Sequence, residues 1–288
     1  MDKEVKLVNK IKHLLKRANV PRYLHHYGPK KYEFYQHALA LFIRQACRLS
    51  LRRVEFLLGS LGFDVPTYSA LCRMNKRASR ILVKLFEQTC AFAQVLVASM
   101  DATGLTRSNP SLYFIKRIDR KKPIKRPLKL SYIIDTRRKK ILALKIRSKP
   151  RHDILDAEYL IRKMYVKPKI LVADKGYDSE SLHKFCYDNG IISMIPSKKN
   201  TRRGFYRKKM KKYWRTKTYH RREISESLFG ATKQKYGASV SSKSFQARKS
   251  DMYIRGILHN LSLVLTRDFQ QSPFIKTIIN LFLYQIKL

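Results

Sequence analysis

Four residues with chemically active side chains are spaced along segment 219–233 as they would be on one face of a helix. Tyr219, Arg222, Glu226 and Lys233 follow one another at intervals of three, four and seven residues. On such a face a carboxylate could hold a divalent metal ion while the cations bind phosphates and the ring packs against a base or sugar. The same spacing also fits a solvated helix face with ordinary ion pairs, so this segment alone does not decide between the two.

Two aspartates follow apolar runs that indicate buried strands. Asp101 follows the uncharged run 93–100, before a stop signal at Thr103-Gly104, and Asp174 follows the run 170–173. The carboxyl ends of strands are the usual place for chemistry on an open α/β sheet, although an aspartate there can also form a turn or cap a helix. With the helix glutamate they give three carboxylates, which repel one another unless a cation such as Mg²⁺ lies among them.

The two aspartates also stand in short motifs, MDATG around Asp101 and ADKGYDS around Asp174. In order and spacing, these motifs and Glu226 resemble the DDE transposases of bacterial and archaeal insertion sequences. Within that family, segment 219–233 is similar to the subgroup with a Y-x2-R-x3-E-x6-K signature. The resemblance covers roughly residues 93–267, and three separate segments agree in order and distance, which chance explains poorly.

The resemblance implies a metal-dependent enzyme. Asp101, Asp174 and Glu226 would be the catalytic residues and would hold two Mg²⁺ ions, for which Mn²⁺ could substitute. The expected reaction is in-line displacement at a phosphate, first cutting the ends of an insertion sequence and then joining the freed 3′-hydroxyls to target DNA. Glu223, three residues before Glu226, lies outside the expected register.

The resemblance also implies DNA partners, namely the terminal inverted repeats of the element and its target DNA, bound by a homodimer. Tyr219, Arg222 and Lys233 would position phosphates near the metal ions. Two alternatives are a ribonuclease-H-like endonuclease that cuts without joining and an inactive, transposase-derived DNA-binding protein.

The charge of the chain points to the same class of partner. It has 63 Lys and Arg against 20 Asp and Glu, a formal net charge of +43, and its expected ligand is a polyanion, most simply nucleic acid. Because 44% of its residues are hydrophobic, the chain can still form a core.

An acidic membrane surface is the other polyanion that would suit this charge. No uninterrupted apolar stretch reaches the roughly 20 residues that a bilayer requires, and the first residues lack the apolar core of a signal peptide. The four cysteines are scattered, without a zinc-site spacing, as in a reduced protein. We therefore expect a cytoplasmic protein, associated with the nucleoid through DNA, that does not enter a membrane.

The first ninety residues show helical periodicity, and residues 54–77 suggest a helix-turn-helix. Gly62 would end the first helix of this pair and Pro66 would begin the second. The second helix would present Arg73, Lys76 and Arg77 to DNA.

The rest of the chain alternates strands and helices in the order of a ribonuclease-H-like mixed sheet flanked by helices, the α/β fold that the resemblance implies. A hairpin is predicted over 128–146, and a helix over 153–162 with Asp153 as its N-cap. The expected domains are a small all-α helix-turn-helix-like domain (1–92), the catalytic domain (93–270) and a C-terminal amphipathic tail (271–288).

One further segment, 198–222, combines 13 Lys or Arg with five aromatic residues and no acidic residue. Aromatic rings among cations suit a surface that follows a DNA backbone and stacks on bases. Trp214 is one of these aromatic residues and is expected to contact DNA, whereas the alternative is a solvated loop.

Overall fold

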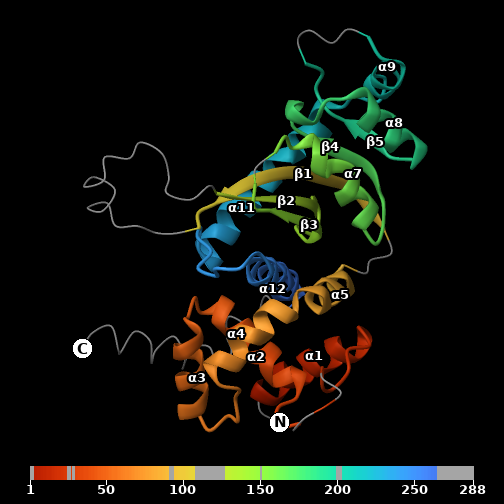
Figure 1. The fold of residues 1–288 in the computed structure, drawn as a ribbon. Helices are drawn as coiled ribbons and strands as arrows, with labels where there is room; N and C mark the ends of the chain where they lie inside the picture. The colour runs from red at the N-terminus through yellow and green to blue at the C-terminus, as the bar shows by residue number, and fades with distance from the viewer. Residues whose placement is uncertain are drawn as a thin grey trace, which may run out of the picture. The chain divides into compact units, whose positions relative to one another are not determined.

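The computed structural model describes residues 3–24, 27, 30–90, 94–107, 127–149, 151–198 and 203–264 (Figure 1). The chain forms two compact units. The sheet unit is Cys90–Ser242, and the helical unit combines Met1–Thr89 with Lys243–Leu288. The predicted tail, 271–288, lies outside the described residues.

The sheet unit is built on five strands in the spatial order β3-β2-β1-β4-β5. Their bounds are β1 Val95–Leu105, β2 Leu128–Asp135, β3 Ile141–Arg147, β4 Pro168–Ala173 and β5 Ile192–Met194. Strand β2 is antiparallel to both of its neighbours, β1 and β3, whereas β4 pairs parallel with β1 and β5 pairs parallel with β4. This mixed sheet flanked by helices is the ribonuclease-H-like fold that was predicted.

Helices cover both faces of this sheet (Figure 1). On one face, α7 (Ile154–Lys163) and α8 (Glu180–Asp188) bury a core that includes Met100, Ile133 and Ala173. On the other face lies α11 (Glu223–Tyr236), whose Phe229 ring stacks on Tyr132 of β2 at a centroid distance of 4.9 Å. Because side chains alternate along a strand, neighbouring residues belong to different faces.

Shorter elements connect these helices and strands. They are the 3₁₀ turns Lys175–Tyr177 and His220–Arg222, with α9 (Phe205–Lys211) and α10 (Thr216–Tyr219). The chain beyond α11 returns to the end of β1 through a single parallel bridge between Thr106 and Ser239.

The helical unit contains six described helices. They are α1 Lys3–Arg17, α2 Phe34–Ala46, α3 Leu51–Ser60, α4 Tyr68–Arg77, α5 Ser79–Thr89 and α12 Phe245–Val264. A buried carboxylate, Asp251 of α12, accepts hydrogen bonds from Arg44 of α2 at 2.8 Å and from Asn75 of α4 at 3.0 Å. These polar contacts tie the last described helix to the N-terminal helices.

The helix pair α3–α4 occupies the predicted helix-turn-helix segment. Ser50 caps α3 by accepting a hydrogen bond from the Arg53 N–H, and Thr67 caps α4 in the same way from Ala70. Gly62 has a φ of 78°, the left-handed conformation that suits glycine at the end of a helix. Pro66 thus precedes the cap of α4 instead of beginning the helix.

The predicted end of the first strand differs from the structure. Strand β1 does not stop at Thr103-Gly104: it continues to Leu105, because β2 pairs with it as far as Leu105 and Leu128. The units divide near residues 89 and 242, so α12 groups with the helical unit instead of with the sheet. Compact units need not be independently folding domains, and the predicted domain boundaries stay predictions. No helix in the described ranges is long and apolar enough to cross a membrane.

Candidate active site

Strand register brings Asp101 and Asp174 together. The last parallel pair between β1 and β4 joins Met100 to Ala173, so each aspartate follows one member of that pair. Neighbouring strands lie about 4.8 Å apart. Met100 and Ala173 are both buried in the core under α7, and the backbone of Asp174 is still extended, with φ −70° and ψ 161°. By alternation, both aspartates belong to the opposite face, which α11 covers.

Helix α11 is fixed along β1 by hydroxyl and amine contacts. The Ser225 hydroxyl lies 3.4 Å from the carboxylate of Asp101 and accepts a hydrogen bond from Ser99 at 3.2 Å. Farther along, the amine of Lys233 donates to the hydroxyl of Thr103 at 2.6 Å. Ser225 is the residue before Glu226, so this contact brings the start of α11, with Glu226, close to Asp101.

The electrostatics show which groups surround Asp101. Burial raises the pKa of its carboxyl, the Ala102 N–H and the Arg222 guanidinium lower it, and the charges of Glu226 and Asp153 raise it further. The net pKa lies above the ordinary value for an aspartate. A positive ion at this position would favour the ionised carboxylate that burial and its acidic neighbours oppose.

Arg222 links the other two carboxylates. Burial lowers the pKa of its guanidinium, but the hydrogen bond and charge of Glu226, together with the charges of Tyr219 and Asp174, raise it above the usual value. The pKa of Tyr219 is also raised, first by burial and then by the charges of Asp174 and Glu226, while Arg222 lowers it. These four residues therefore form one electrostatic group.

Glu226 and Glu223 have different partners. The Arg222 guanidinium donates to Glu226 at 2.6 Å, whereas the Glu223 carboxylate is 3.2 Å from the ring nitrogen of His220. Glu226, and not Glu223, is among the charges that shift the pKa of Asp101. The two glutamates therefore have different electrostatic surroundings, and the choice of Glu226 from the spacing stays a prediction.

The signature segment is helical but interrupted. Tyr219 ends α10, Arg222 lies in the 3₁₀ turn, and Glu226 and Lys233 belong to α11. A single helix over 219–233 is therefore only partly correct. The tighter turn still leaves Arg222 and Glu226 in contact across four positions.

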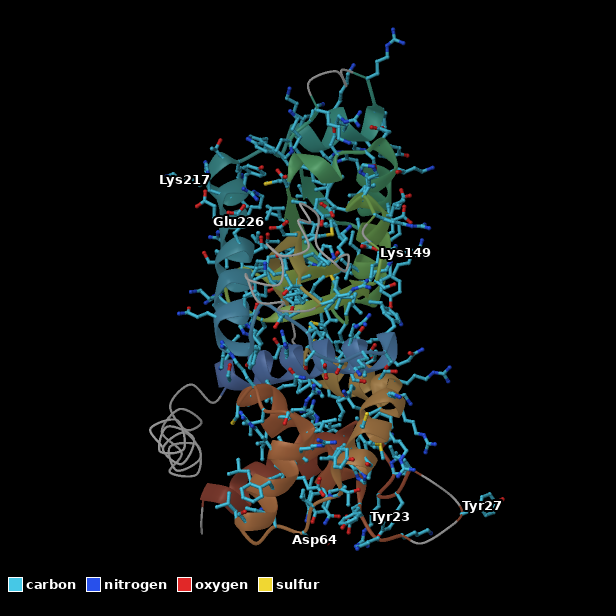
Figure 2. The ribbon with its side chains drawn as sticks, turned by 60° about the vertical axis from the view of Figure 1, so that its left-hand side comes forward. Tyr23, Tyr27, Asp64, Lys149, Lys217 and Glu226 are labelled. Atoms are coloured by element: carbon cyan, nitrogen blue, oxygen red, sulfur yellow. The ribbon has the colours of Figure 1, made fainter. Side chains whose placement is uncertain are left out.

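Besides Arg222, three of the expected DNA-contacting residues have partners within the chain. Lys233 donates to Thr103, and Trp214 lies against Tyr219 with a ring centroid distance of 4.8 Å. Trp214 keeps 36% of its surface exposed. Figure 2 labels Glu226 and Lys217, which lie on the same side of the sheet unit.

The basic segment has one structural and several exposed cations. Asp178, which is buried, accepts hydrogen bonds from the Lys198 N–H and from the Arg207 guanidinium, both at 2.8 Å. Arg207 is therefore held inside the fold. Lys208, Lys211, Lys212, Arg215 and Lys217 are exposed. Residues 199–202 lie outside the described part of the chain.

Asp153 has a different role from the predicted one. Its side chain makes no capping hydrogen bond to α7 and instead forms an ion pair with Lys129 at 2.7 Å. A buried ammonium group is costly without an anionic partner, which favours this pairing. Its charge acts on Asp101, which places it near the site. The sequence signalled only an acidic residue before a helix, and the long-range contact with Lys129 was missed, as were Ser225 and Thr103.

The candidate DNA-reading residues of the helical unit are accessible. Arg73, Lys76 and Arg77 are exposed on α4, while Leu71 and Asn75 are buried on its other side. One face of α4 therefore packs inside the unit, and the other presents three cations.

The donor set is chemically suited to a hard divalent cation. Asp101, Asp174 and Glu226 offer carboxylate oxygens, the ligands that Mg²⁺ prefers, and Arg222 now neutralises Glu226. Within the described ranges, no group of three or more His, Cys, Asp or Glu is arranged as a ready-made metal site. To bind a metal ion, Glu226 would have to break its ion pair with Arg222.

The chain matches the model of a known protein family. A family model described as the transposase DDE domain matches residues 96–261, a range that includes all three carboxylates. No curated protein matches the sequence at a significant level.

Two solved transposase structures have a low similarity to this chain. A Mos1 transposase paired-end complex with the left transposon end has 10% identity and a TM-score of 0.27, over 88% of this chain and 84% of that chain. The Mos1 strand transfer complex has 12% identity and a TM-score of 0.26, over 88% and 84%.

Proposed function

Because the chain belongs to the transposase DDE domain family, we propose that it is a DNA transposase that cuts insertion-sequence ends and joins them to target DNA. The observation that carries the proposal is the parallel pair Met100–Ala173. It supports the placement of Asp101 beside Asp174 on the face of the sheet that α11 covers. The contact of Ser225 with Asp101 supports the placement of Glu226 close to them.

Asp101, Asp174 and Glu226 are proposed to hold two Mg²⁺ ions, with Mn²⁺ as a possible substitute. When bound, such ions polarise the scissile phosphate and lower the pKa of the attacking water or hydroxyl. The carboxylates orient these groups in line with the leaving oxygen. Arg222, once released from Glu226, binds a phosphate oxygen, since a guanidinium matches phosphate geometry.

The proposed reaction has two steps, cleavage and joining. In cleavage, a water oxygen bonds to phosphorus, the bond from phosphorus to the 3′ oxygen breaks, and that oxygen leaves as a 3′-hydroxyl after taking up a proton. In joining, this 3′-hydroxyl attacks a target phosphate, loses its proton, and displaces the target's own 3′ oxygen. No covalent bond between protein and DNA is required.

The remaining contacts are assigned to DNA binding. Exposed cations of segment 203–222 and the ring of Trp214 contact the backbone and bases near the site. Tyr219 and Lys233 position phosphates, and Arg73, Lys76 and Arg77 of α4 contact the terminal inverted repeats. The subgroup assignment from the Y-x2-R-x3-E-x6-K signature and a homodimer on DNA belong to the same proposal.

A two-substrate assay tests this proposal. The purified chain is incubated with labelled DNA carrying the inverted repeats of its own element, with supercoiled target DNA, and with Mg²⁺. We expect nicks at the repeat ends and labelled strand-transfer product, both absent for Asp101→Asn and Asp174→Asn, which should still bind the repeats. Cleavage without joining would instead identify an endonuclease, and binding without cleavage an inactive DNA-binding protein.

A further inference from the structure

The hydroxyl of Ser225 lies where α11 meets β1. Ser225 is 2% exposed, and it directly precedes Glu226 at the start of the helix. On the strand, Ser99 and Asp101 are two positions apart and therefore lie on the same face of the sheet. The Ser225 hydroxyl contacts both of them, at 3.2 Å from the Ser99 hydroxyl and 3.4 Å from the Asp101 carboxylate. It therefore lies between the strand that carries Asp101 and the helix that carries Glu226.

The two oxygens of the Asp101 carboxylate have different neighbours. The Ala102 N–H donates to Oδ1 at 2.8 Å, whereas the Ser225 hydroxyl lies beside Oδ2. The last side-chain bond of an aspartate has only a weak rotational preference of its own, so contacts of this kind decide how the carboxylate is turned. An ionised carboxylate has about four lone-pair positions. One donor on each oxygen would therefore fix its plane and still leave positions for a metal ion.

The Ser225 hydroxyl has one proton and two acceptors within reach. It lies 2.6 Å from the Arg222 carbonyl, which is closer than its distance to Asp101. The Ser99 hydroxyl is 3.5 Å from that same carbonyl. Because hydroxyl protons rotate to suit their acceptors, Ser99 can donate to the Arg222 carbonyl when Ser225 turns its proton toward Asp101. The carbonyl then keeps a donor, so this change avoids the cost of an unpaired buried acceptor.

The next serine of α11 has a different environment. Ser227 is exposed, and its hydroxyl donates to the Glu223 carbonyl of the same helix at 3.2 Å. A bond back to an earlier carbonyl is an ordinary use of serine within a helix. Ser225 makes such a bond too, and in addition it contacts β1 beside Asp101.

We propose that Ser225 is a positioning residue of the metal site, whose hydroxyl donates to Oδ2 of Asp101 and holds that carboxylate in the orientation that binds a divalent ion. This inference rests on the proposed function of Asp101 as a metal ligand. Groups that orient metal ligands typically change metal affinity by about 10–100-fold when they are removed.

Two variants of Ser225 test this role. Ser225→Ala removes the hydroxyl, and Ser225→Cys fills the same space with a weaker hydrogen-bond donor. Ser227→Ala is the matched control, since it removes a hydroxyl two positions away on the same helix. The thermal midpoint of each protein is measured without metal and across Mg²⁺ and Mn²⁺ titrations, in the absence of DNA. Cleavage of the repeat ends is then measured against Mg²⁺ concentration.

For Ser225→Ala we expect the half-saturating metal concentration to rise roughly tenfold or more in both measurements. Ser225→Cys should change it in the same direction, so the test holds even where the alanine variant does not fold. Ser227→Ala should leave it unchanged. A hydroxyl that only anchors α11 would lower the midpoint without metal and leave the metal dependence as in the parent.

A double variant separates Asp101 from Glu226 as the residue on which Ser225 acts. In a Glu226→Gln background, Asp101 and Asp174 remain, so Ser225→Ala should still raise the half-saturating metal concentration of the thermal midpoint by about the same factor. A rise that is absent in that background would show that Ser225 acts by placing Glu226, and the inference about Asp101 would be wrong.

Two further results would overturn the inference. They are an unchanged metal dependence in both Ser225 variants, and a parent protein whose midpoint responds to neither metal. Failure of the proposed function looks different: the parent and the Ser225 variants would respond to metal as expected and yet leave the repeat ends uncut.

Discussion

The guanidinium of Arg222 donates a 2.6 Å hydrogen bond to the carboxylate of Glu226, the residue that the proposed reaction needs as a metal ligand. The Glu226 side chain is 56% exposed and that of Arg222 22%, so the pair lies at the rim of the site and not in its interior. The guanidinium of Arg222 thus compensates the negative charge of Glu226. A metal ion that binds Glu226 would replace Arg222 as its partner, and the released guanidinium would then bind a phosphate.

Replacing Arg222 by Gln should separate metal binding from catalysis. Without its partner, Glu226 is a better ligand, so the half-saturating Mg²⁺ concentration should fall about two- to fivefold, the range expected for a partly exposed ion pair. Cleavage at saturating Mg²⁺ should nevertheless decrease, because no guanidinium then binds the phosphate. Metal titrations of thermal stability and of cleavage measure the two effects, and a rise in the half-saturating concentration would contradict the exchange.

Glu226→Gln and Glu223→Gln form a matched pair three residues apart. Loss of a metal ligand removes several kcal/mol of transition-state stabilisation, so Glu226→Gln should lower the cleavage rate by roughly 10³-fold or more. Glu223 contacts His220 at the surface, and its variant should stay within about twofold of the parent. Single-turnover cleavage gives both rates. Equal rates for the two variants would remove Glu226 from the site.

Neutralising the exposed lysines of the basic segment should weaken the salt dependence of DNA binding. Changing Lys208, Lys211, Lys212 and Lys217 to Gln should reduce the slope of log affinity against log salt by about 0.9 for each phosphate that is no longer neutralised. Arg207→Gln also removes a positive charge, but from a residue whose guanidinium is bonded to Asp178. The slope measured for this variant should therefore equal that of the parent. An unchanged slope in the fourfold variant would identify the segment as merely solvated.

Changing Arg73, Lys76 and Arg77 to Ala should affect the choice of DNA more than its overall binding. If α4 hydrogen-bonds to base edges, removing each such side chain costs about 1–3 kcal/mol of discrimination against other sequences. Competition binding with repeat-end and scrambled DNA measures the ratio of affinities. The lysine variants of segment 203–222 should weaken both DNAs alike, and a preserved ratio in the α4 variant would exclude base recognition by this helix.

Asp156→Asn should destabilise the sheet unit. Its carboxylate is fully buried and binds Lys129, Lys145 and Arg147, so its loss leaves Lys129 with Asp153 and removes the carboxylate that Lys145 and Arg147 bind. Removing one member of a buried ionic network costs about 3 kcal/mol. Denaturant unfolding at neutral pH measures this cost. Glu158→Gln on the same helix, whose side chain is 49% exposed, should change stability by less than about 0.5 kcal/mol.

The effect of Asp156 should also depend on pH. Burial would raise the pKa of its carboxyl, but hydrogen bonds from Lys145 and Arg147 and the charges of Lys145 and Lys129 bring it below the ordinary value. A lowered pKa stabilises the folded state above the unfolded pKa of about 4, and the gain disappears as pH falls through the folded pKa. The difference between the parent and Asp156→Asn should therefore shrink below about pH 4.

Local patterns in the sequence predicted much of this fold. The apolar runs before Asp101 and Asp174, the hairpin and the N-terminal helices depend on side-chain periodicity, which each segment carries by itself. The extension of β1 to Leu105 could not be predicted in this way. It depends on pairing with Leu128, a partner that lies 23 positions away in the chain.

The site was predictable to the extent that spacing along one segment decides it. Glu226 could be chosen over Glu223 from the intervals to Arg222 and Lys233. The contacts of Asp153 with Lys129 and of Ser225 with Asp101 join residues far apart in sequence, and only the packed sheet brings them together. An N-cap was a reasonable expectation for Asp153, but a nearby buried amine competes successfully for its carboxylate.

Because β4 is held in register with β1, the face on which each β4 side chain lies depends on whether its position in the strand is odd or even. Ala173 faces the core under α7 and Asp174 belongs to the α11 face because the side chains of β4 alternate. Deleting one residue from β4 would exchange the two faces, turning the aspartate inward and an apolar side chain outward, whereas deleting two would restore the alternation at the cost of a shorter strand. Length variation at this position of the chain is therefore tolerable only in even steps.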